Sequence, residues 1–201
     1  LALPYFRFLL SHQEVAAAQN AWRELATVDH SLDQYLPSPA NLIVNGSFEE
    51  NLLNGGFDWW YQPSPHVALA LDTSVFHSGT RSLSISFDGQ NAPEAGLSQL
   101  VAVKPDTEYA FSAESKTEDI DSASGPRFAI TDAYTNFSYF LSDDLLGTNP
   151  WHTQRARFRT GSETNLLLLK IVRQPANALI RGKIWIDDLK LVEDESKDPQ
   201  R

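Results

Sequence analysis

The sequence predicts a mainly β protein, an antiparallel β-sandwich preceded by a short α-helical hairpin. Apolar residues at helical spacing are concentrated in residues 1–27. After residue 40, ten strand-like runs follow one another, separated by clusters of Gly, Pro, Asn and Asp. Several runs alternate apolar with small or polar residues, as residues 82–87 (SLSISF) do. This spacing and alternation fit a sandwich, and 201 residues are enough for one sandwich with an extra piece.

Residues 1–27 predict two short antiparallel helices. Pro4 suits the first turn of a helix. Residues 11–14 have the Ser-x-x-Glu form of a capping box, which predicts that the second helix begins near Ser11. The apolar stripes of the two helices are Phe6, Leu9 and Leu10, and Val15, Ala18, Trp22 and Leu25.

This hairpin resembles a fragment of a tetratricopeptide-type helical repeat. One such pair cannot bury its own apolar stripe, so further helices would precede it in the full protein. The alternative is an N-terminal extension that packs on the sandwich. Residues 28–40 contain two prolines and several turn formers, which predicts a linker.

The predicted strands occupy residues 41–193, and residues 194–201 predict a charged, solvated tail. Residues 166–172 are apolar on both faces, which favours a central strand that is covered on both sides. The ten runs are residues 57–61, 67–71, 82–87, 97–103, 108–113, 127–131, 136–141, 152–160, 165–173 and 179–192.

The last of these runs changes parity near its end. Ile184 and Ile186 share one face, but Leu189 would then point to the other. A strand packed on one side can do this only with an extra residue, which predicts a β-bulge at residues 187–188. The bulge places two adjacent aspartates at the edge of the core. Their repulsion would be relieved by a neighbouring positive charge or by a hard cation.

Three motifs follow one another at wide spacing: N-x-x-x-N-G-S-F-E at residues 41–49, H-S-G-x-x-S-L at residues 77–83, and G-x-I-W-I-D-D-L-x-L at residues 182–191. In this order they resemble the β-jelly-roll carbohydrate-binding modules of families 4, 9 and 22, within the galactose-binding-like fold. The resemblance covers residues 41–193. It implies a non-catalytic domain that binds a polysaccharide and holds a structural calcium ion where the first and last strands meet.

Carried over residue by residue, the resemblance implies four calcium ligands. They are the side chains of Glu49 and Asp187 and the main-chain carbonyls near Ser78 and Thr80. Calcium takes about six to eight oxygens, and carbonyls freed by a bulge and a glycine turn are suitable donors. The alternative is that the two carboxylates cap turns or pair with Arg81.

Aromatic residues are the candidates for stacking on sugar rings. Adjacent residues of a strand face opposite ways, so one of Trp59 and Trp60 is expected at the surface. Trp185 has the opposite parity to its two isoleucine neighbours and is also expected to face away from the core.

A basic row accompanies these aromatics. Arg155, Arg157 and Arg159 share one parity on a protein whose net charge is −10. If the row lies beside Trp185, an acidic polysaccharide would be attracted to it. The alternative is that the arginines pair with acids of neighbouring strands.

Composition and motifs narrow the function classes. The net charge of −10 argues against a nucleic-acid partner, and no apolar run reaches the roughly 20 residues of a membrane helix. The chain has no cysteine, and it lacks the G-x-S-x-G, H-E-x-x-H and phosphate-loop motifs, so an enzyme is not expected. A hydrolase would need facing carboxylates, and adjacent acids do not provide them.

The sequence therefore predicts a calcium-stabilised, non-catalytic polysaccharide-binding module. Such a domain suits a cell-envelope, extracytoplasmic setting. The alternative is a structural module without glycan binding, whose N-terminal helices bind a protein partner.

Overall fold

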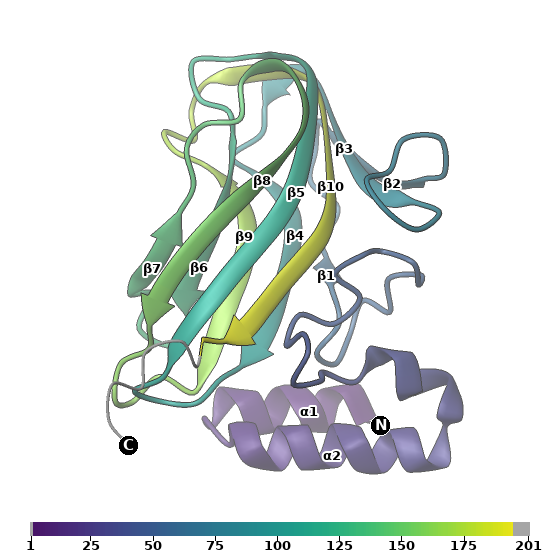
Figure 1. The fold of residues 1–201 in the computed structure, drawn as a ribbon, viewed down its shortest axis with the longest axis vertical. Helices are drawn as coiled ribbons and strands as arrows, with labels where there is room; N and C mark the ends of the chain where they lie inside the picture. Colours follow the sequence, from purple (N-terminus) through teal and green to yellow (C-terminus); the bar gives the residue numbers. More distant parts are fainter. Residues whose placement is uncertain (1, 195–201) are drawn as a thin grey trace.

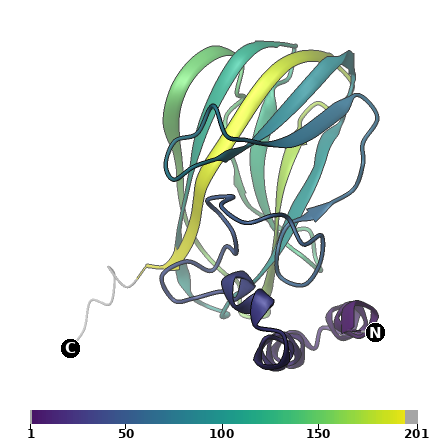
Figure 2. The ribbon, with the colours of Figure 1, turned by 90° about the vertical axis from the view of Figure 1, so that its right-hand side faces the viewer.

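The structure is a computed structural model, and it describes residues 2–194. Two five-stranded antiparallel sheets pack face to face, and two helices lie across one end of the sandwich (Figure 1). Figure 2 shows the same arrangement from the side, with both helices below the strands. The predicted fold class is therefore confirmed.

The first sheet, called sheet 1, has the strand order β1-β4-β9-β6-β7. Its central strand, β9, contains residues 166–172, the run that is apolar on both faces, as expected. The strands are β1 (Trp60–Tyr61), β4 (Glu94–Ala102), β9 (Leu166–Arg173), β6 (Pro126–Asp132) and β7 (Ser138–Leu141).

The second sheet, called sheet 2, has the order β2-β3-β10-β5-β8. Every pairing in both sheets is antiparallel. The strands are β2 (Val67–Asp72), β3 (Ser82–Asn91), β10 (Leu179–Glu193), β5 (Glu108–Asp121) and β8 (Gly147–Arg159).

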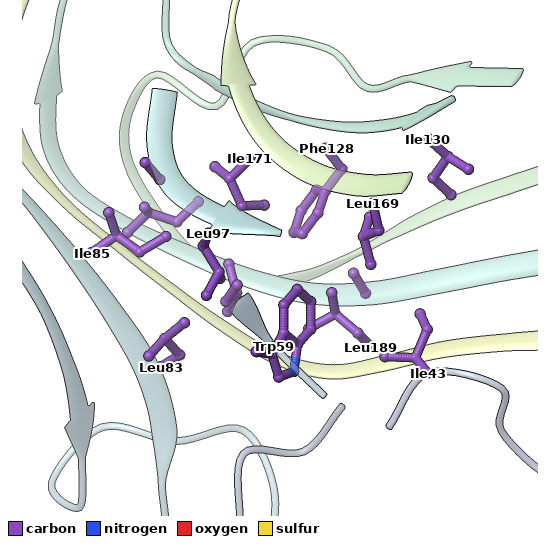
Figure 3. Packing of buried hydrophobic residues seen from close by; sticks show 14 of the residues in the cluster. Ile43, Trp59, Leu83, Ile85, Leu97, Phe128, Ile130, Leu169, Ile171 and Leu189 are labelled. Atoms are coloured by element: carbon purple, nitrogen blue, oxygen red, sulfur yellow. The ribbon is translucent and has the colours of Figure 1, made fainter. Parts of the chain in front are cut away.

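The core lies between the two sheets. Alternate residues of each strand point inward, so that Ile85 of sheet 2 and Leu97 of sheet 1 belong to one buried cluster (Figure 3). Trp59 and Phe128 are fully buried in it. This core holds the strands rigidly enough to present side chains on the outer faces of both sheets.

The bulge in the last strand is present. The register between β10 and β5 shifts between Asp187 and Lys190, and Asp188 adopts a left-handed backbone conformation with φ of 49°. As a result Ile186 and Leu189 both reach the core, at 0% and 1% exposure.

The segment before β1 joins the two sheets. The backbone N–H of Leu42 donates to the carbonyl of Leu191 in β10, at 2.9 Å. The Gln99 side chain of β4 bonds both backbone groups of Val44, at 3.0 and 2.8 Å. Ile43 and Val44 are both buried, one in the sandwich core and one against the helices.

The helical hairpin consists of α1 (Ala2–Ser11) and α2 (Val15–Val28). The predicted capping box is wrong, because the Ser11 hydroxyl donates to the carbonyl of Phe8 and closes α1 instead of opening α2. Gln13 has a φ of 62°, and the N–H of Glu14 donates to the carbonyl of Leu9 at 2.9 Å. This is the Schellman pattern of a helix end, and it turns the chain into α2.

The hairpin packs on the outer face of sheet 1. Phe6 meets Phe57 edge to face, with ring centroids 4.9 Å apart, and the Tyr134 hydroxyl donates to the carbonyl of Leu10 at 2.9 Å. The two helices therefore cover one end of that face, which fits an extension that packs on the sandwich. The likeness to a tetratricopeptide repeat stays a prediction.

The predicted linker is a packed segment. It contains the 3₁₀ helix η1 (His30–Tyr35), and Tyr35 is 4% exposed. The indole N–H of Trp22 donates to the Tyr35 carbonyl at 3.0 Å, and the Tyr35 hydroxyl donates to the carbonyl of Asn51 at 2.7 Å. Within residues 2–194, no helix has the length and apolarity needed to cross a membrane.

Candidate functional site

A groove of about 400 Å³ lies on the outer face of sheet 1, beside helix α1. Strand alternation creates its floor. Because Leu97 and Gln99 of β4 are buried, Ser98 and Leu100 point outward into the groove. Leu168 of the neighbouring strand β9 continues this floor.

Trp60 forms one side of the groove. It pairs with Ser98 across β1 and β4, and its side chain is half-buried. The indole N–H donates to the carbonyl of Gly56 at 3.0 Å, which fixes the orientation of the ring. A flat apolar surface is thereby held beside an apolar floor.

Polar groups stand around these apolar surfaces. Gln62 and Ser98 supply an amide and a hydroxyl, and Glu94 pairs with Lys170 at 3.2 Å across the rim. From helix α1, the guanidinium of Arg7 lies 4.4 Å from the centre of the Trp60 ring. An aromatic face combined with neutral and charged hydrogen-bonding groups is suited to a ligand with both apolar faces and hydroxyl groups.

Only one of the predicted tryptophans lines this groove. Trp59 is in the core at 0% exposure and stacks on Phe48, with ring centroids 5.3 Å apart. The prediction that one of the pair faces outward is confirmed for Trp60, whereas Trp59 as a ligand-binding residue is wrong, because the core leaves no access to it.

Trp185 lies on sheet 2, away from the groove. It faces away from the core, as expected, but it is only 3% exposed. Its indole N–H donates to a carboxylate oxygen of Asp72 at 2.8 Å, and the ammonium groups of Lys116 and Lys183 stand 5.0 and 5.1 Å from the ring. This covering makes Trp185 unsuited to stacking on a sugar, contrary to the prediction.

The basic row also belongs to sheet 2. Arg155 and Arg157 are exposed on β8 and line a shallow depression with Lys190. Arg159 pairs with Glu108 of the neighbouring strand β5 at 4.0 Å, and Arg157 pairs with Asp194 at 3.2 Å, so the alternative of local ion pairing holds for these two residues. The structure therefore places the arginines and Trp60 on opposite sheets, and the predicted set does not form one site.

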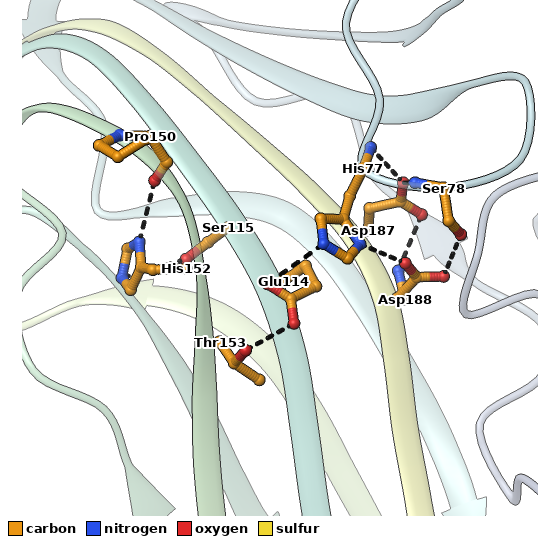
Figure 4. A network of polar contacts seen from close by, with 9 residues as sticks. All are labelled: His77, Ser78, Glu114, Ser115, Pro150, His152, Thr153, Asp187 and Asp188. Atoms are coloured by element: carbon orange, nitrogen blue, oxygen red, sulfur yellow. Dashed lines mark hydrogen bonds and ion pairs between the residues drawn. The ribbon is translucent and has the colours of Figure 1, made fainter.

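The predicted calcium residues surround the loop that contains residues 77–81. Asp187 is fully buried, and its Oδ2 atom accepts hydrogen bonds from the backbone N–H groups of His77 and Ser78 at 2.9 and 3.2 Å (Figure 4). Burial raises the pKa of the Asp187 carboxyl, and these hydrogen bonds oppose the rise. Asp188 accepts from His77 Nδ1 at 2.7 Å, and this bond raises the pKa of His77.

Glu49 holds the same loop from the other side. Its carboxylate accepts from the backbone N–H and the hydroxyl of Thr80, at 2.9 and 2.6 Å, which lowers the pKa of Glu49. The Arg81 guanidinium donates to the Glu49 carbonyl. Turn capping and a contact with Arg81, the alternative to calcium, are therefore both present.

The donor types around this loop fit calcium, because carboxylates and main-chain carbonyls are the oxygens it prefers. The carboxylate oxygens of Glu49 and Asp187 are, however, already engaged by N–H and O–H donors. Within residues 2–194, no group of three or more His, Asp or Glu side chains is arranged to hold a metal ion. A calcium ion would have to compete with these hydrogen bonds.

Most groove residues were not identified by sequence reasoning. The alternation in β4 could have indicated Ser98 and Leu100, and the two-sided apolar run of β9 could have indicated Leu168. Arg7 carries no such signal, since its position depends on how α1 packs against the sheet.

A two-sheet sandwich with an aromatic groove on one outer face defines a small β-sandwich binding domain. A family model described as "Carbohydrate binding domain" matches residues 40–177. The chain belongs to this carbohydrate-binding domain family. The match leaves out both helices and the last strand, β10.

Solved structures share the fold at low sequence identity. A family 4 carbohydrate-binding module is 14% identical, with a TM-score of 0.55, and the match covers 76% of this chain and 99% of the other. A family 16 module is 21% identical, with a TM-score of 0.51 and coverages of 76% and 100%. A family 22 module joined to a xylanase of Clostridium thermocellum, solved with xylohexaose, is 15% identical, with a TM-score of 0.52 and coverages of 80% and 30%. No curated protein gave a significant match.

Proposed function

We propose that this chain is a non-catalytic glycan-binding domain and that the groove beside α1 is its binding site. The observation that carries the proposal is the fixed, half-buried Trp60 ring, which lines a groove that also contains hydroxyl, amide and charged groups. Membership of the carbohydrate-binding domain family supports the ligand class. The family 22 module that was solved with a xylan oligosaccharide gives the same indication.

In this proposal a pyranose ring places its apolar C–H face against the Trp60 indole. Leu100 and Leu168 extend the apolar contact. The sugar hydroxyls bond to Gln62 and Ser98, which can both donate and accept. A groove of about 400 Å³ lies within the usual range for small-ligand sites and accommodates a short stretch of glycan.

The groove is not built for glycoside hydrolysis. That reaction uses two carboxyl groups on opposite sides of the scissile bond. Among the residues 2–194 that line the groove, Glu94 is the one carboxylate, and it is paired with Lys170. We therefore propose binding without cleavage.

A weakly bound calcium ion is a second element of the proposal. Its ligands would be the side chains of Glu49 and Asp187 and the carbonyls of Ser78 and Thr80. It would stabilise the loop between them by bridging the first segment of the sandwich to β10. The competing hydrogen bonds lead us to expect a low affinity.

One observation favours the alternative, a domain that binds a protein partner through its helices. On the outer side of α1, Tyr5 and Phe8 are 56% and 53% exposed. They lie three positions apart, on the same face of the helix. Exposed aromatic residues are enriched at protein interfaces.

The test is a binding screen of the purified chain against neutral and acidic polysaccharides by affinity electrophoresis. The bound site is then identified from the indole N–H signals of the five tryptophans in ¹⁵N-labelled protein. The proposal expects the Trp60 signal to shift and the Trp185 signal to stay in place. Absence of binding across the panel would favour the protein-interaction alternative.

A further inference from the structure

Helix α1 contributes directly to the groove, although the family match begins only at residue 40. Phe6 and Leu9 are buried, at 3% and 7% exposure, and hold the helix on the sandwich. Arg7 and Leu10 lie three positions apart on one face of the helix, and both line the groove. The helix is thus a wall of the groove as well as a cover for the sheet.

The Arg7 side chain is placed to meet a ligand. Its guanidinium lies 4.4 Å from the Trp60 ring centre, and the residue as a whole is exposed. Within the part of the chain that the structure describes, Arg7 makes no ion pair or side-chain hydrogen bond. A guanidinium stacked on an aromatic ring keeps its N–H groups available at its edge, where a carboxylate can accept two parallel hydrogen bonds.

The charge of the groove contrasts with that of the whole protein. Among the described residues, Arg7, Lys170 and Glu94 are the charged ones that line it, giving a local excess of one positive charge on a chain of net charge −10. Because Lys170 is already paired with Glu94, the uncompensated charge is that of Arg7. A local positive site of this kind favours an anionic group on the ligand.

We propose that Arg7 is a specificity-determining residue of the groove and that it selects glycans carrying a carboxylate, that is, uronic acid residues. The sugar ring contacts Trp60 and its carboxylate accepts hydrogen bonds from the guanidinium. This inference rests on the proposed glycan-binding function, and it adds the chemical class of the sugar and a role for a helix outside the family match.

The test compares matched polymers. Polygalacturonate, alginate and glucuronoxylan are each paired with the carboxyl-reduced form, which keeps the sugar backbone and removes the charge. Affinities of the wild-type chain are measured by isothermal titration calorimetry at low and high salt. We expect at least one acidic polymer to bind about tenfold more tightly than its reduced form, and added salt to weaken that preference.

Three variants separate the contributions. Arg7→Gln is expected to lower the acid-to-reduced affinity ratio to near one, and Arg7→Lys to keep part of it, because a lysine retains charge but not the planar fork. Arg23→Gln on α2, whose guanidinium bonds Asn20 at 3.1 Å on the exposed side of the helix, is the control and should keep the ratio. Circular dichroism confirms that each variant remains folded.

The outcomes distinguish this inference from the function on which it rests. If the wild-type chain binds glycans but treats each acidic polymer and its reduced form alike, the role of Arg7 is overturned while glycan binding stands. The role is likewise overturned if Arg7→Gln keeps the wild-type ratio. If no glycan in the wider screen is bound, the proposed function itself fails.

Discussion

The buried carboxylate of Asp187 accepts a hydrogen bond from the backbone N–H of His77 at 2.9 Å, although 110 positions separate the two residues in the chain. Asp187 is the last residue of β10 in regular register with β5 before the bulge, and it lies on the opposite face from Ile186. The same carboxylate accepts from the N–H groups of Ser78 and Asp188. One side chain therefore fixes both the loop and the bulge.

Asp187→Asn is expected to lower the free energy of unfolding by about 2–4 kcal/mol, because the amide turns one acceptor into a donor against backbone N–H groups. Asp188→Asn is the matched control. Its side chain is 31% exposed, so we expect a loss below about 1 kcal/mol. Urea unfolding in the presence of EDTA measures both. Equal losses in the two variants would contradict the role given to Asp187.

Calcium is expected to raise the melting temperature only modestly. A site with a millimolar Kd stabilises the fold by about 1.4 kcal/mol at a tenfold excess of the ion, which corresponds to a rise in Tm of about 3 °C. Differential scanning fluorimetry with calcium, magnesium or EDTA measures this. Glu49→Gln should abolish the calcium response. An unchanged Tm in the wild-type chain, or an equal rise in the variant, speaks against the site.

Gly46 is expected to tolerate no side chain. A Cβ atom there would overlap the carbonyl oxygen of Leu189 in the bulged part of β10. We expect Gly46→Ala to cost about 2–4 kcal/mol of unfolding free energy, because both contacting groups belong to a backbone held on two sides. Gly161→Ala is the control, since its Cβ would meet the Tyr139 hydroxyl at an ordinary 3.4 Å. Chemical denaturation of both variants tests the difference.

The sequence was informative where the signal could be counted along the chain. The parity change between Ile186 and Leu189 predicted the bulge, because a one-sided strand has no other way to bury both. The ten strand-like runs could be found because clusters of Gly, Pro, Asn and Asp separate them along the chain. Alternation also predicted that one of Trp59 and Trp60 faces outward. It could not say which, since that depends on which side of the strand packs against the opposite sheet.

The remaining features depend on tertiary packing. The Ser-x-x-Glu sequence at Ser11 satisfied a helix-start pattern, yet the same serine closes α1, because Gln13 adopts a left-handed conformation. The groove collects residues from α1, β1, β4 and β9, and no local pattern joins them. The parity of Trp185 was right, but the ring is covered by Lys116 of the neighbouring strand β5 and by Lys183, two positions earlier in β10.

Stability should depend on pH through Asp58. This carboxyl is fully buried, and burial raises its pKa from 3.8 to about 6. Since the folded-state pKa exceeds the unfolded one, the stabilisation from the protonated form is complete below the unfolded value and is lost as the pH rises through about 6. Near neutral pH, the buried charge therefore lowers the free energy of unfolding by about 3 kcal/mol.

Asp58→Asn is expected to remove this cost. Its amide oxygen can still accept the Leu53 N–H, which bonds the Asp58 carboxylate at 2.7 Å. The variant should therefore gain stability over the wild-type chain at neutral pH and differ little near pH 4. Unfolding curves across that range provide the comparison. Parallel pH profiles for the two proteins would show that Asp58 does not titrate as described.

We propose that glycans bind in the groove beside α1, on the surface formed by Trp60. The most direct measurement is the affinity of Trp60→Ala for a polysaccharide that the wild-type chain binds, compared with that of Trp151→Ala on the opposite sheet. We expect the first change to weaken binding about tenfold or more and the second to leave it within about twofold. Full affinity in Trp60→Ala, or a loss confined to Trp151→Ala, would contradict the claim.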